Sequence, residues 1–172
     1  MNYSTALLER ARDIRLLVLD VDGVLTDGRL YFNAEGEALK AFHVRDGAGI
    51  VQLRRSGIEV AIISGRNSAA VNSRMRELGV THIHQGINDK QQALQTLLQS
   101  LNLTGNDIAC IGDDTPDLPM LEIARLSVAV ADAHPKVRAA AHYVTQLAGG
   151  LGAVREICDL ILQAQSLATD AF

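Results

Sequence analysis

Several residue types are scarce in this chain. Its 172 residues include no tryptophan, two cysteines and three prolines, and aromatic residues make up 3%. Cys110 and Cys158 lie far apart and form no Cys-x-x-Cys pair, so we expect both to be small core side chains. No apolar run approaches the roughly 18 residues of a membrane span, and residues 1–15 have no apolar signal-peptide core. These absences predict a cytoplasmic protein.

A basic surface is also missing. The formal net charge is −4, which argues against a nucleic-acid partner and leaves any phosphorylated substrate to be attracted by local groups. Hydrophobic residues make up 48% and charged residues 21%, ordinary values for a globular protein. The length suits one domain with a sizeable core. We therefore expect a single domain over 1–172, with a hairpin flap at about 29–43.

Buried-strand and helix patterns alternate along the chain. Alternation of this kind predicts βαβ units and an α/β fold of three layers, a Rossmann-like parallel sheet with helices on both faces. Residues 29–43 carry a turn signal between two apolar stretches and predict a β-hairpin. Residues from Ser166 onward look loose. The expected strands are 14–20, 58–63, 82–85, 108–111, 126–130 and 143–144, and the expected helices are 5–13, 47–55, 67–78, 89–101, 116–124, 135–140 and 152–165.

The stretch from Leu16 to Gly23 is the strongest candidate for a functional site. The apolar run Leu16–Leu19 ends in Asp20, Asp22 follows, and Gly23 permits a tight exit from the strand. Ligand sites in parallel sheets lie at the carboxyl ends of the strands. Two such close carboxylates repel each other unless a cation or a shared proton intervenes, and oxygen ligands without His or Cys favour Mg²⁺. An aspartate there can also act as a nucleophile, while a solvated Asx turn is the plain alternative.

Two further candidates follow predicted strands. Ser64 and Gly65 end one strand, where a hydroxyl and backbone N–H groups can bind phosphate; the alternative is that Ser64 only caps a helix. Lys90 lies in the first turn of a predicted helix, where the helix dipole prefers anions. It is either an exposed surface lysine or a group that offsets charge on a phosphate and on Asp20.

A third stretch, Gly112–Asp117, crowds three carboxylates into a strand-to-helix turn. Asp114 and Asp117 can each be explained as capping or first-turn residues. With Asp113 beside them and a second Asp-x-Asp elsewhere, the pattern favours a cation site.

Taken in order, Asp-x-Asp, Ser-Gly-Arg, Asn-Asp-Lys and Gly-Asp-Asp-x-x-Asp resemble the four motifs of the haloacid dehalogenase-like phosphohydrolases. The resemblance implies that Asp20 takes the phosphoryl group and that Asp22 is the acid and base, with its backbone carbonyl on Mg²⁺. It also implies that Ser64 and Lys90 hold the phosphate. Asp113 would bind the metal directly, Asp117 would support it, and Asp114 would be a supporting group or a cap.

The short spacings between motifs resemble the class without a cap domain. Within it, 22–28, 42–50, 128–135 and 149–160 are similar to 3-deoxy-D-manno-octulosonate 8-phosphate (KDO 8-phosphate) phosphatases. This resemblance implies a Mg²⁺-dependent homotetramer on the route to lipopolysaccharide, with hairpins that partly close neighbouring sites. Arg45, Arg66 and Arg74 would suit the sugar-acid carboxylate, with surface arginines as the alternative.

Two other interpretations stay open at this point. Phosphatases for nonulosonate 9-phosphates share these motifs, and so do non-catalytic modules attached to synthetases. A non-catalytic module is expected to lose the nucleophile, the lysine or the metal aspartate, and this chain keeps Asp20, Lys90 and Asp113. His43 and His134 are expected to be structural, because the mechanism already has its acid and base. Gly149 and Gly150 predict a turn before the last helix.

Overall fold

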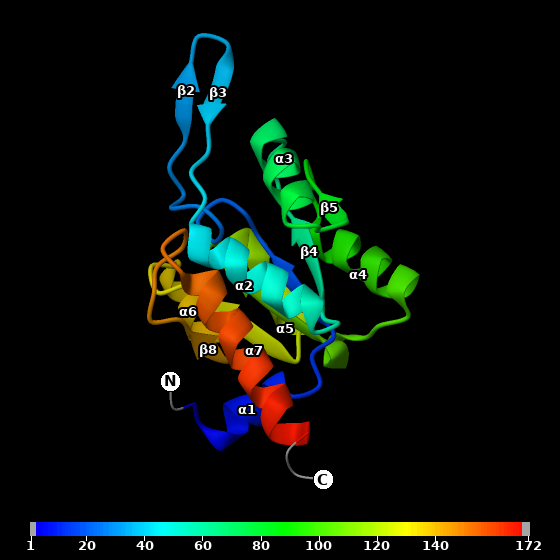
Figure 1. The fold of residues 1–172 in the computed structure, drawn as a ribbon. Coiled ribbons are helices and arrows are strands. Elements are labelled where there is room, and N and C mark those ends of the chain that lie inside the picture. The colour runs from blue at the N-terminus through cyan, green and yellow to red at the C-terminus, as the bar shows by residue number, and fades with distance from the viewer. Residues whose placement is uncertain (1–2, 170–172) are drawn as a thin grey trace.

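The computed structural model describes residues 3–169 and contains one six-stranded parallel sheet (Figure 1). The strand order is β5-β4-β1-β6-β7-β8, and every neighbouring pair is parallel. This confirms the predicted α/β fold. The strands are β1 (Leu16–Leu19), β4 (Glu59–Ile63), β5 (His82–His84), β6 (Ile108–Gly112), β7 (Leu126–Ala129) and β8 (Tyr143–Val144).

Helices cover both faces of this sheet. Helix α7 packs against α1 and α2 on one face, whereas α5 packs against α4 and α6 on the other. The helices are α1 (Thr5–Ala11), α2 (Val44–Arg55), α3 (Ala69–Glu77), α4 (Lys90–Leu101), α5 (Leu118–Ile123), α6 (Pro135–Ala140) and α7 (Ala153–Thr169), with 3-10 turns at Gly105–Asp107 and Thr115–Asp117.

The register of the central strands sets the position of the functional residues. Leu19 of β1 pairs with Ile62 of β4 on one side and with Ile111 of β6 on the other. The carboxyl ends of these strands therefore lie at one edge of the sheet. All four residues of β1 are inaccessible to solvent, as expected for a strand covered on both faces.

Both cysteines lie in the core as free thiols, as predicted. Across residues 3–169, we find no helix that is both long and apolar enough to cross a bilayer.

The predicted hairpin consists of β2 (Tyr31–Asn33) and β3 (Gly36–Leu39), which pair antiparallel. It projects away from the sheet and its helices (Figure 1). Its apolar side chains stay exposed, with Phe32 60% and Leu39 52% accessible. The hairpin therefore does not fold back to bury this strip against its own sheet.

Several predicted boundaries were wrong. Helix α2 begins at Val44 rather than Gly47, because His43 Nδ1 accepts the Arg45 N–H and caps the helix. Helix α3 begins at Ala69 rather than Asn67, because Ser68 is its cap. The helix predicted over 116–124 is a 3-10 turn capped by Asp114, followed by α5. Helix α7 runs to Thr169, beyond the predicted end, because no proline or glycine interrupts it.

Candidate active site

A buried lysine joins two carboxylates at the edge where β1 and β6 end. Lys90 Nζ donates to Asp20 Oδ1 and to Asp117 Oδ1, each at 2.7 Å. All three side chains are at most 9% exposed. Lys90 is therefore not a surface lysine: the fold brings it directly to the aspartate that follows β1.

Asp117 organises the loop after β6. Its second oxygen, Oδ2, accepts the N–H groups of Asp113 at 3.0 Å and Asp114 at 3.3 Å. The Asp114 side chain accepts from Thr115 N at 2.7 Å and caps the 3-10 turn. Of the two roles expected for Asp114, the structure shows the cap.

Asp20, Asp113 and Asp117 form a cluster in which one oxygen from each lies within 4.8 Å of the others. Lys90 offsets one of the three negative charges, so two remain when all three are ionised. Burial, followed by the charge of Asp117, raises the pKa of Asp20 to about 6, although Lys90 opposes the rise. Burial, and then the charges of Asp20, Asp117 and Asp114, raises the pKa of Asp113 to about 7. Oxygen donors with surplus negative charge fit a hard divalent cation such as Mg²⁺.

The pKa of Lys90 is raised. Burial alone would lower it, but the adjacent Asp20 and Asp117 carboxylates outweigh that effect. The lysine therefore stays charged and holds Asp20 in place.

Gly23 lets the loop after β1 approach Asp113. A Cβ on Gly23 would lie 2.2 Å from Asp113 Oδ2, and its φ of +90° also favours glycine. On the other side of this loop, a Cβ on Gly149 would lie 1.6 Å from the Gly23 carbonyl oxygen. The Gly150 N–H donates to Val24 O at 2.9 Å. The predicted glycine turn therefore also packs against the loop that carries Asp22.

The Asp22 side chain contacts a different set of groups. Its Oδ1 pairs with Lys40 Nζ, at the base of the hairpin, and its Oδ2 lies 3.7 Å from Arg66 Nε. Glu37 of β3 joins this group through Lys40 at 3.3 Å and Arg66 at 3.6 Å. Reasoning from the sequence did not find Lys40 or Glu37, because no motif or strand end marks them.

Ser64 is buried directly after β4. Its Oγ accepts the Arg66 N–H at 3.4 Å, and its own N–H donates to His84 O at 2.9 Å. The interpretation of Ser64 as a helix cap was wrong, since Ser68 caps α3. Helix α3 therefore starts after Ser68 and not after Ser64.

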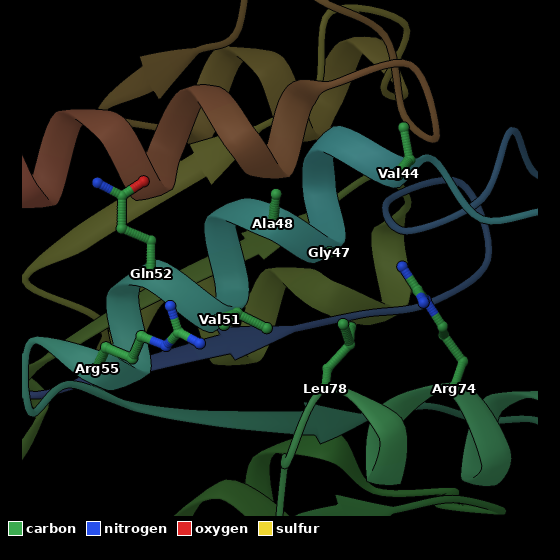
Figure 2. A pocket seen from close by; sticks show the side chains of 8 residues that line it. All are labelled: Val44, Gly47, Ala48, Val51, Gln52, Arg55, Arg74 and Leu78. Atoms are coloured by element: carbon green, nitrogen blue, oxygen red, sulfur yellow. The ribbon is translucent and has the colours of Figure 1, made fainter.

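The three predicted arginines do not gather. Arg66 lies beside Asp22, with its guanidinium 5.7 Å from the centre of the Phe32 ring. Arg74 pairs with Glu77 at 2.9 Å and points from α3 toward α2 in Figure 2. Arg45 is exposed at the start of α2. Of these three arginines, Arg66 alone pairs with Asp22 in the described chain.

A groove of about 490 Å³ lies between α2 and α3 (Figure 2). None of the clustered carboxylates lines it, and its charged side chains are Arg55 and Arg74.

His43 and His134 are helix caps whose Nδ1 atoms accept backbone N–H groups at 3.2 Å, so both are structural as expected.

Comparison with known proteins decides the family. Residues 81–156 match the haloacid dehalogenase-like hydrolases. The chain is 51% identical over 168 residues to the 3-deoxy-D-manno-octulosonate 8-phosphate phosphatase KdsC of Escherichia coli strain K12, which covers 98% of this chain and 89% of that protein. The chain belongs to the KDO 8-phosphate phosphatase family. The Yersinia pestis KDO 8-phosphate phosphatase is 53% identical over 159 residues, covering 92% of this chain and 85% of that protein.

Solved KDO 8-phosphate phosphatases have the same fold. The Yersinia pestis structure has a TM-score of 0.93 at 51% identity, covering 95% of this chain and 89% of that one. The Moraxella catarrhalis structure, in complex with magnesium, phosphate and KDO, has a TM-score of 0.93 at 44% identity and covers 98% of both chains.

Proposed function

We propose that this chain hydrolyses KDO 8-phosphate to KDO and inorganic phosphate, with Mg²⁺, on the route to lipopolysaccharide. The contact of Lys90 with Asp20, at the edge where Asp113 also lies, is the observation that carries the proposal. It combines a fixed aspartate, a permanent cation and further carboxylates, which phosphoryl transfer requires. Family membership then selects the substrate.

In the proposed mechanism an Asp20 oxygen attacks the phosphorus atom, and the bond to the sugar oxygen breaks. Asp22 gives its proton to that oxygen as KDO leaves, and later takes a proton from the water that hydrolyses the aspartyl-phosphate. Ser64 and Gly65 bind phosphate oxygens, and Lys90 offsets their charge. Asp20, Asp113 and the Asp22 carbonyl would hold Mg²⁺, which stabilises negative charge on the phosphoryl group when bound. Asp117 would hold Asp113 in position, and Asp114 would stabilise the loop after β6 that carries both residues.

We assign recognition of the sugar-acid carboxylate to arginine, with Arg66 first because it lies beside Asp22. Arg45 and Arg74 lie away from the carboxylate cluster of their own chain, so they would serve this role from a neighbouring subunit or only at the far end of the sugar.

The experiment is a phosphate-release screen with Mg²⁺ against KDO 8-phosphate, nonulosonate 9-phosphates and simple sugar phosphates. We expect the highest kcat/KM on KDO 8-phosphate. Preference for a nonulosonate 9-phosphate would reassign the substrate within the sugar acids. Absence of release from every ester would support a non-catalytic module instead.

We also propose a cytoplasmic homotetramer. The exposed apolar strip of the hairpin supports the assembly, because a two-stranded ribbon with such side chains is marginal alone and prone to pairing. Free thiols at Cys110 and Cys158 suit a reducing compartment. A neighbour's hairpin would shield the open site from water.

The double substitution Tyr31→Ser and Leu39→Ser tests the assembly, because these residues pair across the hairpin. We expect light scattering to show dissociation, and turnover of the sugar acid phosphate to fall more than that of a small phosphate ester. Glu35→Gln, in the exposed hairpin turn, is the matched control. An intact tetramer, or equal losses on both substrates, would rule out this role for the hairpin.

A further inference from the structure

Each of the two aspartates after β1 contacts a lysine of its own. Asp20 pairs with Lys90, and Asp22 pairs with Lys40. The Lys40 side chain is only 2% exposed, whereas that of Asp22 is 20% exposed. The ammonium group is therefore shielded from solvent, whereas part of the Asp22 carboxylate is accessible.

The charges around Asp22 are already balanced. Lys40 and Arg66 carry two positive charges, which offset the charge of Glu37 and the charge that Asp22 has in its ionised form, after it gives up a proton. The Asp22 side chain also lies outside the cluster of Asp20, Asp113 and Asp117. A metal at that cluster does not need the Asp22 carboxylate to offset charge, which leaves this side chain available for proton transfer.

The two Asp22 oxygens are not equivalent. A lysine ammonium only donates hydrogen bonds, so Oδ1, which accepts from Lys40, cannot present a proton in that direction. Oδ2 faces Arg66, whose side chain is 40% exposed and lies 3.7 Å away, beyond hydrogen-bonding distance. Oδ2 is therefore the oxygen available to a substrate.

Lys40 is itself held by the hairpin. Glu37 of β3 lies 3.3 Å from Lys40 Nζ, and its other oxygen accepts from the Ser68 hydroxyl at the start of α3. The base of the hairpin, α3 and the loop after β1 thus meet at one group of charges, of which the Lys40 side chain is the most buried. Acid–base catalysis requires a reactive carboxyl held in a defined position, and the contact with Lys40 holds the Asp22 carboxyl on one side.

We propose that Lys40 is a positioning residue for phosphoryl transfer, which orients the Asp22 carboxyl so that Oδ2 meets the oxygen of the departing sugar. The inference rests on the proposed phosphatase function. It also makes the hairpin part of its own chain's active site, in addition to any contact with a neighbour.

The test compares Lys40→Met with Lys40→Arg on two esters under single-turnover conditions. A sugar alkoxide leaves only with a proton, whereas 4-nitrophenolate leaves without one. We expect Lys40→Met to slow release of the sugar about 10- to 100-fold and release of 4-nitrophenolate less than about threefold. Lys40→Arg, which keeps a donor-only cation, should recover most of the loss.

Two further measurements separate positioning from a structural role. Mg²⁺ affinity by calorimetry should be unchanged in Lys40→Met, because Lys40 lies outside the metal cluster. Lys136→Met, at an exposed lysine of α6, is the matched control and should behave as wild type. If Lys40→Met does not fold, Glu37→Gln takes its place, with the same dependence on the leaving group at smaller amplitude.

Equal losses on both esters, weakened Mg²⁺ binding or no loss on the sugar ester would each overturn the role of Lys40. Inactivity of the wild-type protein on both esters would instead contradict the proposed phosphatase function, so the two failures are distinguishable.

Discussion

Lys90 donates one hydrogen bond to Asp20 and another to Asp117, which links the residue after β1 to the loop after β6. The pairing of β1 with β6 brings Asp20 and the loop that carries Asp117 to the same edge of the sheet, and Lys90 is the first residue of α4, which follows β5 of that sheet. Within this group Lys90 supplies the permanent positive charge.

Lys90→Met should destabilise the metal-free protein. Removing one partner of a buried ion pair leaves uncompensated charge, which typically costs about 3–5 kcal/mol. Urea unfolding in EDTA measures this loss, and Mg²⁺ should restore part of it by supplying positive charge to Asp20 and Asp117. A free energy of unfolding equal to wild type would contradict the buried pairing.

The stability of the metal-free protein should depend on Asp113. Its pKa is raised from 3.8 to about 7, so between these values the folded state holds a proton that the unfolded state has lost. Stability from this group therefore falls as pH rises from about 4 to about 7. In EDTA, Asp113→Asn should be more stable than wild type at pH 8, with the difference absent at pH 4.

Urea unfolding of both proteins at the two pH values measures this difference, and Mg²⁺ should reverse it at pH 8 by stabilising only the wild type. If Asp113→Asn were less stable than wild type in EDTA at pH 8, the ionised Asp113 carboxylate would not destabilise the folded state, which contradicts this prediction.

Gly149→Ala should damage activity more than stability. The added Cβ would lie 1.6 Å from the Gly23 carbonyl oxygen, so the loop bearing Asp22 must move. Displacement of reacting groups by about 1 Å can cost about 100-fold in rate, whereas overpacking costs about 1–3 kcal/mol. Turnover and thermal unfolding together check this, with Leu151→Ala in the same loop, at an exposed side chain, as control. Wild-type turnover in Gly149→Ala would show that the loop can move without consequence.

Chelation should abolish turnover, and Mg²⁺ should restore it. Ca²⁺ should substitute poorly, because its longer and looser coordination disturbs the in-line geometry. Phosphate release after dialysis against EDTA, followed by addition of each metal, measures both effects. Full turnover in excess EDTA would contradict the requirement for Mg²⁺.

The sequence predicted the sheet and the edge where Asp20, Ser64 and Asp113 follow strands, because short apolar runs and the residues after them are local signals. It did not predict the group around Asp22. Lys40 and Glu37 carry no local signal, and only the path of the hairpin brings them to Asp22. The predicted start of α3, at Asn67, was wrong for a related reason. Ser64 and Ser68 can each cap a helix, and only the contacts of the folded chain show that Ser68 does so.

The most direct test of the account is phosphate release from KDO 8-phosphate by wild type and by Asp20→Asn, both with Mg²⁺. An amide cannot form the acyl-phosphate, so we predict turnover by wild type and a loss of roughly 10³-fold or more in the variant. Thermal unfolding of the variant shows whether it is folded. Substantial release by folded Asp20→Asn would contradict the assignment of Asp20 as nucleophile, and with it the proposed mechanism.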